Sequence, residues 1–348
     1  MTAPSSICIL RLSAIGDVCN AVAAVQAIQA AQPQSQITWI IGKLEYSLLE
    51  GLPGVEFIVF DKRHGKQAFK DFKQQMRGRR FDVLLHMQVA LRANWLARLI
   101  PAKRKIGFDK QRAKELHSLF INERIRAQTS PHVLEGFFAF AEKVGVAPEA
   151  LAHTEWRMPL AESDLAFAAE QLPNRRTVVI VPAASNKERN WLPERYAAVA
   201  DHAHQLGFEV VLCGGPSDSE RELERQILQT STSAVRSLIG RTTLKQLQAV
   251  LTRAALVIAP DTGPAHMANA AGTPVLGLYG HANPTRTGPW RYRDWVVEVY
   301  HQHVEQQRGK PANALPWGVR VKGEDVMASI EVSAVCERFD AMVQHFGL

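Results

Sequence analysis

The chain has few of the features that mark membrane, disulfide-rich or metal-binding proteins. It has four cysteines in 348 residues, none in a Cys-x-x-Cys pair, and no apolar run approaching about 18 residues. The N-terminus has no charged segment followed by an apolar core. No pair of His or Cys, His281 and His303 included, has the spacing of metal ligands. We therefore expect no signal peptide, membrane span, disulfide or metal, and a cytoplasmic location with reduced thiols.

The chain also lacks the Gly-x-Gly-x-x-Gly fingerprint, which disfavours an enzyme that transfers hydride from a dinucleotide. Low-complexity segments and internal repeats are absent. What is present is an apolar content of 46% over a length that suits two domains of roughly 150 to 170 residues. The sequence thus predicts an ordered protein with two sizeable cores.

Short apolar runs alternate with helical patterns along the chain, which is typical of α/β domains with mainly parallel strands. We predict two Rossmann-like, doubly wound domains at 1–160 and 161–330, a linker near 150–175, and a last helix in 331–348 that packs back on either domain. The strands expected in the first domain are Ile7–Leu10, Ile37–Ile41, Val55–Phe60, Val83–Met87 and Lys105–Phe108. Those expected in the second are Val178–Val181, Glu209–Cys213, Val235–Ile239, Leu256–Ala259 and Val275–Tyr279. In such domains ligands bind at the carboxyl ends of the strands, so each strand-to-helix turn is a candidate site.

The positive charge is concentrated in the first half of the chain. Residues 1–160 carry 22 Lys/Arg against 14 Asp/Glu, and within 62–114 the ratio is 16 to 3. An acidic partner is indicated, either an anionic membrane surface with phosphorylated lipid or a nucleic acid. A solvated basic face without a dedicated partner is the third interpretation.

One turn stands out between the apolar runs at 256–259 and 275–279. Asp261, Thr262 and Gly263 follow the first run, and Pro264 suits the first turn of a helix rich in small residues. Gly263 allows close backbone approach, and the free N–H groups of a helix N-terminus favour an anion. His266 falls in the first helical turn. The alternative is an ordinary βαβ unit in which Asp261 and Thr262 only cap the helix.

Asp17 occupies a similar place after the first apolar run. The turn reads Ser13-Ala-Ile-Gly-Asp17, and Gly16 permits a tight bend. Asp17 is either a helix cap, the commoner role for Asp at that position, or a carboxylate that accepts the proton of a substrate hydroxyl.

Three further turns in the second half carry polar groups. Ser185, Lys187 and Arg189 follow the first strand of that half, where a hydroxyl and a cation, either Arg189 or Lys187, suit a diphosphate. Asp218 follows the next strand. Its carboxylate either binds ribose hydroxyls or, with Ser217, caps the start of a helix. Thr242 lies at another such junction.

Four segments carry a resemblance that covers nearly the whole chain. They are Ser-Ala-Ile-Gly-Asp at 13–17, Asn-Trp-Leu-Pro-Glu-Arg-Tyr at 190–196, Cys-Gly-Gly-Pro-Ser-Asp at 213–218 and Asp-Thr-Gly-Pro-Ala-His-Met-Ala-Asn-Ala-Ala-Gly-Thr-Pro at 261–274. With them the chain resembles the ADP-heptose:lipopolysaccharide heptosyltransferases, inverting glycosyltransferases of the GT-B architecture. The segment Tyr-Gly-His-Ala-Asn-Pro-Thr-Arg-Thr-Gly-Pro-Trp at 279–290 is most similar to the OpsX-like group, which is thought to add the first heptose to 3-deoxy-octulosonate (Kdo).

This resemblance implies a role for each candidate. Asp17 would be the general base, and a phosphorylated Kdo-lipid A acceptor would bind the basic first domain at the cytoplasmic face of the inner membrane of a Gram-negative bacterium. The better-known members have a Thr pair and then Lys where this chain has Ala184, Ser185 and Arg189. No cofactor is required, since ADP-heptose is a substrate. On the resemblance the donor would be held by Ser185, Asp218, Asp261, Thr262, Gly263 and His266, and the turn positions of Arg189 and Thr242 add these two. For the acceptor we predict residues of the basic first half: Ser13, Lys62, Arg63, Arg104 and Lys105.

Two other functions remain open on the residues alone. One is a different GT-B activity, with another nucleotide-sugar donor or as a sugar-nucleotide epimerase. The other is a basic nucleic-acid-binding module, which would need aromatic side chains placed to stack on bases. The aromatics of the basic segment fall mostly at core-facing positions, so we expect no nucleic-acid partner; they are Phe69, Phe72, Phe81, Trp95 and Phe108.

Overall fold

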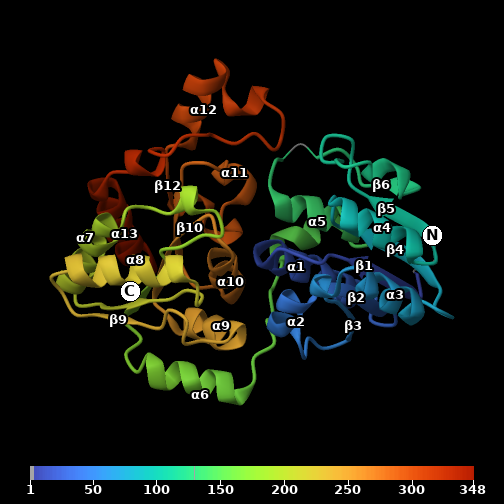
Figure 1. Ribbon diagram of the computed structural model, residues 1–348, viewed down its shortest axis with the longest axis horizontal. Helices are drawn as coiled ribbons and strands as arrows, with labels where there is room; N and C mark the ends of the chain where they lie inside the picture. Colours follow the sequence, from blue (N-terminus) through green and yellow to red (C-terminus); the bar gives the residue numbers. More distant parts are fainter. Residues whose placement is uncertain (1–3, 129) are drawn as a thin grey trace. The chain divides into compact units, whose positions relative to one another are not determined.

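The computed structural model describes residues 4–128 and 130–348. The chain divides into two compact units, Met1–Pro159 and Leu160–Leu348 (Figure 1). The division falls inside the segment predicted as a linker. That segment also forms structure of its own, a short 3-10 helix at Pro148–His153 and helix α6 at Glu162–Gln171, which packs against α9 (Leu244–Arg253) of the second unit.

The first unit is built on a six-stranded, all-parallel sheet in the order β3-β2-β1-β4-β5-β6. Its central strands are apolar and buried on both faces, as expected of a parallel sheet covered by helices. The strands are β1 Ser6–Leu10, β2 Gln36–Gly42, β3 Val55–Phe60, β4 Phe81–His86, β5 Ala102–Gly107 and β6 Glu123–Arg124. The helices are α1 Ile15–Ala31, α2 Lys43–Leu49, α3 Gly65–Gln75, α4 Leu91–Leu99 and α5 Val133–Glu142.

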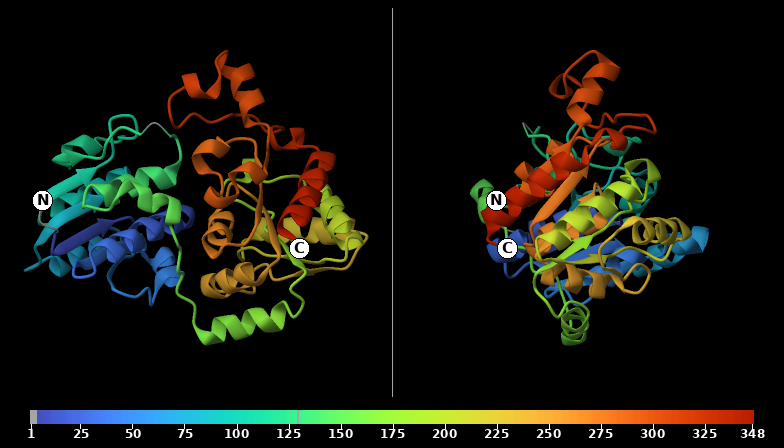
Figure 2. Two further views of the ribbon diagram at one scale, coloured as in Figure 1. Left: turned by 180° about the vertical axis from the view of Figure 1, so that it is seen from behind. Right: turned by 90° about the vertical axis from the view of Figure 1, so that its left-hand side faces the viewer.

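The second unit repeats this architecture with a parallel sheet in the order β12-β11-β10-β7-β8-β9, and helices flank the sheets in the views of Figure 2. The strands are β7 Thr177–Ile180, β8 Glu209–Leu212, β9 Val235–Ser237, β10 Leu256–Pro260, β11 Val275–Tyr279 and β12 Val296–Glu298. The remaining helices are α7 Pro193–Gln205, α8 Asp218–Thr230, α10 Gly263–Ala271, α11 Pro284–Thr287, α12 Tyr300–Arg308 and α13 Val332–Phe346.

The C-terminal helix α13 belongs to the second unit. Val335, Phe339 and Met342 are fully buried in that unit's core, and the helix packs against α7 and β12. The helix α12 has a small apolar cluster of its own, formed by Tyr300, Val304, Val321 and Val326.

Each sheet reverses its strand order at one point, between β1 and β4 in the first unit and between β7 and β10 in the second. Crevices at such switch points are where open α/β sheets bind ligands. The segment Ser13–Asp17 follows β1, while Ser185 and Arg189 follow β7 and Asp261 follows β10. The topology thus brings the main candidate residues of each unit to its switch point.

Candidate functional site

Asp17 lies in the first turn of α1, but it does not cap the helix. The N-cap position is Ala14, and the Asp17 carboxylate instead forms an ion pair with the guanidinium of Arg11, the residue that follows β1. The helix-cap interpretation of Asp17 is therefore wrong. Its side chain is 35% exposed, against 10% for Arg11, so the carboxylate is the accessible member of the pair.

Arg11 is a candidate site residue that sequence reasoning missed. Its Nη1 donates a hydrogen bond to the carbonyl oxygen of Met87 at 2.6 Å, and its guanidinium lies 5.2 Å from the centre of the Phe137 ring. Burial lowers the pKa of Arg11, and the charge of Asp17 partly offsets that shift. A cation immediately after a buried apolar strand was the available signal, because such a residue must find an anionic partner close by.

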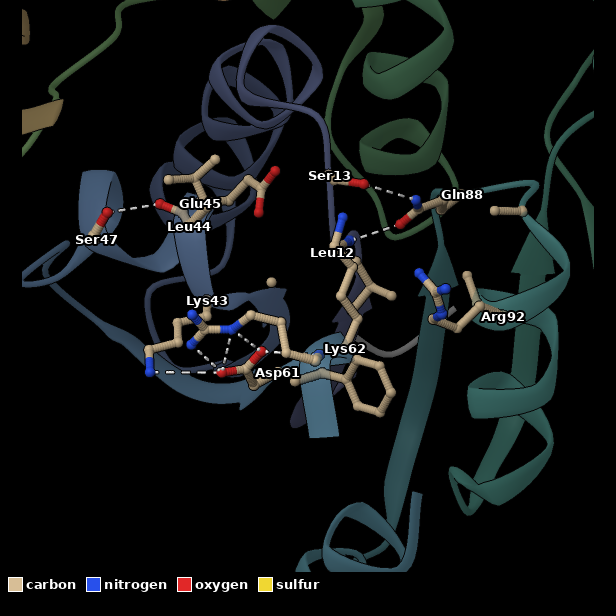
Figure 3. Close-up of a pocket in the computed structure, with 15 residues that line it drawn as sticks. Leu12, Ser13, Lys43, Leu44, Glu45, Ser47, Asp61, Lys62, Gln88 and Arg92 are labelled. Atoms are coloured by element: carbon tan, nitrogen blue, oxygen red, sulfur yellow. Dashed lines mark hydrogen bonds and ion pairs between the residues drawn. The ribbon is translucent and has the colours of Figure 1, made fainter. Parts of the chain in front are cut away.

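A cavity of about 450 Å³ opens at the carboxyl ends of β1, β2, β3 and β4 (Figure 3). Gln88 organises one side of it, since its Nε2 donates to the Ser13 hydroxyl at 3.3 Å and its Oε1 accepts from the backbone N–H of Leu12 at 2.7 Å. Of the predicted acceptor residues, this pocket brings together Ser13, Lys62 and Arg63.

Cations dominate the rim of the pocket. The Arg63 guanidinium binds Asp61 at 2.6 Å and holds the pKa of that carboxyl well below its usual range, and Lys43 lies 3.5 Å from the same carboxylate. Arg92, from α4, lies on the side of Leu12 opposite to Lys43 in Figure 3. Lys43 and Arg92 were missed from the sequence, although both follow strands whose carboxyl ends meet at this edge.

The structure does not bring Arg104 and Lys105 to this pocket. Both lie on β5, where Arg104 forms a two-pronged ion pair with Glu123 at 2.7 and 2.8 Å. The Lys105 ammonium donates to the carbonyl oxygen of Ala97 at 2.7 Å, and burial lowers its pKa. Side chains along a strand point to the two faces of the sheet, whereas the pocket is formed by residues beyond the strand ends.

In the second unit an ion pair joins two of the predicted donor turns. Arg189 donates through Nη1 to the carboxylate of Asp261 at 3.2 Å and to its backbone carbonyl at 3.1 Å. Both side chains are largely buried, at 16% and 12% exposed. A hydrogen bond from the backbone N–H of Ala184 to Oδ1 of Asn190, at 2.8 Å, holds the loop that carries Ser185.

The N-terminus of α10 is not closed by a side chain. Thr262 is the N-cap residue but forms no capping hydrogen bond, and the Asp261 carboxylate is engaged by Arg189, so the capping interpretation of this turn is wrong. Pro264 lies in the first turn, and His266 is buried there. The first N–H groups of such a helix are suited to an anion.

Asp218 and Thr242 lie beside helix caps rather than acting as caps. Ser217 caps α8 in a capping box with Glu220, while the exposed Asp218 carboxylate forms no hydrogen bond or ion pair with the described residues. Glu220 also accepts from the backbone N–H of Gly215 at 2.7 Å. Thr243, not Thr242, caps α9. These two assignments to the donor stay predictions.

Within residues 4–128 and 130–348 no three or more His, Cys, Asp or Glu side chains gather so that they could hold a metal ion. In the same part of the chain no helix combines the length and apolar character needed to cross a membrane. The absence of a required cofactor stays a prediction.

Comparison with known proteins identifies the family. The sequence model described as glycosyltransferase family 9 (heptosyltransferase) matches residues 69–317. The chain is also 43% identical over 334 residues to the lipopolysaccharide core heptosyltransferase OpsX of Haemophilus influenzae, covering 96% of this chain and 95% of that protein. The chain belongs to glycosyltransferase family 9. The predicted resemblance to heptosyltransferases is thereby confirmed, and this family 9 protein is an enzyme that transfers a glycosyl group.

Solved structures extend the likeness of this heptosyltransferase to its fold. A glycosyltransferase family 9 protein from Veillonella parvula has a TM-score of 0.80 at 22% identity, covering 98% of this chain and 97% of that one. The Escherichia coli heptosyltransferase WaaC with ADP has a TM-score of 0.72 at 20% identity, covering 97% and 99%. The predicted fold class, two Rossmann-like α/β units of the GT-B type, is confirmed.

Proposed function

We propose that this heptosyltransferase transfers L-glycero-D-manno-heptose from ADP-heptose to a Kdo residue of Kdo-lipid A in lipopolysaccharide inner-core synthesis. The identity of 43% to a lipopolysaccharide core heptosyltransferase supports the acceptor class. The Escherichia coli enzyme WaaC, which shares this fold, has been solved with ADP and with ADP-2-deoxy-2-fluoro heptose, which supports the donor.

The observation that carries the mechanism is the Arg11–Asp17 ion pair at the switch point of the first sheet. Asp17 accepts the proton of an acceptor hydroxyl. The hydroxyl oxygen then forms a bond to the anomeric carbon on the face opposite ADP, and the bond from that carbon to the phosphate oxygen breaks with its electron pair going to ADP. The configuration inverts. The role of Arg11 is to orient the carboxylate, because its guanidinium is buried and anchored by the Met87 carbonyl.

The donor half of the reaction belongs to the second unit. The diphosphate binds at the open N-terminus of α10, where Thr262, Gly263 and His266 lie. Arg189 donates from Nη1 to Asp261, and its other N–H groups, held in a fixed orientation, donate to phosphate oxygens. As ADP leaves, that guanidinium compensates the charge that develops on it. Ser185 contacts the diphosphate, while Asp218 and Thr242 contact the nucleoside end.

The acceptor binds in the pocket of the first unit. Kdo carries a carboxylate, and a phosphorylated acceptor adds further negative charge, which Lys43, Lys62 and Arg92 would attract. Because the acceptor is a lipid, the enzyme associates with the cytoplasmic face of the inner membrane as a peripheral protein.

The test is ADP release with a panel of donors and acceptors. Saturable turnover is expected with ADP-heptose and with Kdo-lipid A or its truncated Kdo forms. Other nucleotide-sugars serve as the matched controls and should give no more than background. Equal turnover with a different nucleotide-sugar, or donor conversion without acceptor, would favour another GT-B activity or an epimerase.

A further inference from the structure

The first unit exposes four large apolar side chains. Leu91 and Trp95 on α4 are 45% and 51% exposed, and Leu116 and Leu119, in the segment after β5, are 65% and 75% exposed. Trp95 thus departs from the core-facing position expected for the aromatics of the basic segment. We call these four side chains the apolar face. Single exposed leucines need no explanation, but a gathering of such residues marks an interaction surface.

Direct contacts join the two segments that make up the apolar face. The backbone N–H of Leu91 donates to the Glu115 carboxylate, and the Asn94 side chain donates to the Glu115 carbonyl at 2.7 Å. The Trp95 ring lies edge-on to Phe120 with centroids 5.8 Å apart. The segment around residues 115–120 is therefore packed on α4, and the exposed side chains of both belong to one surface.

The segments that carry the apolar face are rich in cations. Residues 91–120 hold eight Lys/Arg against two Asp/Glu, and neither acid is free. Asp109 forms a buried ion pair with Arg112 at 2.8 Å, and Glu115 accepts from the backbone of α4. Among the described residues, four exposed cations of this segment form no ion pair: Arg92, which lines the pocket, and Arg98, Lys110 and Lys114.

We propose that the apolar face, together with the exposed cations Arg98, Lys110 and Lys114, docks the first unit on an anionic lipid bilayer. Leucine side chains enter the acyl boundary, the Trp95 ring lies at the headgroup level, and the cations bind lipid phosphates. The proposal rests on the proposed function, in which the acceptor is anchored in lipid. Helix α4 links the two, because Arg92 and Ala93 line the acceptor pocket while Leu91 and Trp95 belong to the apolar face.

Charge favours a bilayer over a second copy of the chain or an apolar protein partner. A second copy would bring the same excess of cations against this one, and like charges oppose such contact. A bilayer containing phosphatidylglycerol supplies a continuous negative surface beside an apolar interior. An anionic bilayer therefore accounts for both the exposed leucines and the unpaired cations.

The test is co-sedimentation of the full chain with vesicles of phosphatidylethanolamine and phosphatidylglycerol at a ratio of three to one. The double variant Leu116→Asn/Leu119→Ser should lower the partition coefficient at least tenfold. Asn suits position 116 because Leu116 has a φ of 62°, which Asn tolerates better than Leu. The matched control is Leu165→Ser/Leu228→Ser in the second unit, where the leucines are 48% and 39% exposed; it should bind within about twofold of wild type.

The contribution of the exposed cations is tested separately. Lys110→Gln/Lys114→Gln should weaken binding by about fivefold for each charge removed, and Lys310→Gln/Lys322→Gln is the control in the second unit. Binding of wild type should fall with added salt and be weak on phosphatidylcholine alone. Thermal melting verifies that each variant is folded.

Unchanged vesicle binding in a folded Leu116→Asn/Leu119→Ser variant would overturn the proposal. So would a change of wild type from dimer to monomer by the same substitutions without any vesicle binding, which would assign the face to self-association. With a lipid-free Kdo acceptor the leucine variant should keep wild-type ADP release. If no ADP-heptose turnover occurs but the binding difference persists, the proposed function fails while the docking surface is supported.

Discussion

The two units share a scaffold but arrange charge at the switch point in opposite ways. In the first unit a buried cation, Arg11, holds a carboxylate that is 35% exposed. In the second, a carboxylate that is only 12% exposed, Asp261, holds the guanidinium of Arg189 beside an open helix N-terminus. On the proposed function, the first arrangement presents a base and the second presents donors for an anion. The difference lies in the surroundings of each pair: Asp17 is more exposed than Arg11, whereas Arg189 and Asp261 are both largely buried, at 16% and 12% exposed, beside the N-terminus of α10.

The largest effect is expected from removing the accessible carboxylate of the first unit. Asp17→Asn keeps the shape but cannot accept a proton, so the rate of ADP release should fall by about 10²- to 10⁴-fold. Stopped or continuous ADP detection with saturating ADP-heptose and Kdo-lipid A measures it. Asp71→Asn, on the exposed surface of α3, is the control and should leave the rate unchanged. A rate within tenfold of wild type in Asp17→Asn would remove Asp17 from catalysis.

The next largest effect is expected at the guanidinium of the second unit. Arg189→Met removes the charge that faces the leaving diphosphate, and turnover should drop by about 10²- to 10³-fold with weaker ADP binding. Arg189→Lys should recover part of the rate, because it restores charge without the fork. Calorimetric titration with ADP gives the affinity. Unaltered ADP binding in Arg189→Met would show that the diphosphate lies elsewhere.

Arg11→Lys should have a smaller effect because lysine keeps the charge. A lysine ammonium cannot bind both Asp17 and the Met87 carbonyl as the forked guanidinium does. The value of kcat should therefore fall about tenfold, which corresponds to the loss of one hydrogen bond to a charged group, while KM changes little. Arg79→Lys, which alters a comparable pair with Glu56 away from the pocket, is the matched control. A loss of equal size in both variants would reduce Arg11 to a stabilising residue.

The first unit should also be the more sensitive of the two to mild acid. His86 and His117 lie with ring centroids 4.4 Å apart, and both rings are hydrogen-bonded to the side-chain Oδ1 of Asn94, at 2.8 and 3.1 Å. Burial lowers the pKa of His86 to about 3 and that of His117 to about 4. Both rings are neutral when folded but take up protons near pH 6.5 when unfolded, so stability is lost as the pH falls from about 6.5 towards 4.

Hydrogen exchange at pH 7 and pH 5, read by peptide mass spectrometry, measures this difference for each unit. Peptides from β4 and α4 should lose protection earlier than those from β7 and α7, and the melting temperature should fall by roughly 5 °C. His117→Gln should reduce the acid sensitivity of the first unit. Equal loss of protection in both units would contradict a role for the histidine pair.

The smallest effect is expected from chelation. On the proposed function Arg189 and the α10 N-terminus supply the charge that balances the diphosphate, so EDTA should change ADP release by less than about twofold. A loss that added Mg²⁺ restores would assign part of that charge to a metal ion.

Sequence patterns were sufficient for the strands other than β6 and β12 and for residues at strand ends, because parallel strands bring their carboxyl ends to one edge whatever their order. Asp17, Arg189 and Asp261 were found in this way. The partner of a charge could not be found, since the Arg11–Asp17 and Arg189–Asp261 pairs depend on side-chain direction and on contacts across the sheet. For the same reason charge counting assigned Arg104 and Lys105 to the acceptor although β5 directs them to other partners.

Short elements were also missed. The strands β6 and β12 have two and three residues, too few to show a period, and α6 lies in a segment whose prolines suggested a linker. The sequence analysis singled out neither Leu116 nor Leu119, because their exposure depends on how their segment packs on α4.

The central claim is that the first unit supplies the base and the second binds the donor. The most direct test measures ADP-heptose binding and ADP release side by side in Asp17→Asn and Arg189→Met. The account predicts that Asp17→Asn binds ADP-heptose with wild-type affinity but does not release ADP, whereas Arg189→Met binds it weakly. Wild-type ADP release by Asp17→Asn, or lost donor binding in Asp17→Asn with normal binding in Arg189→Met, would contradict it.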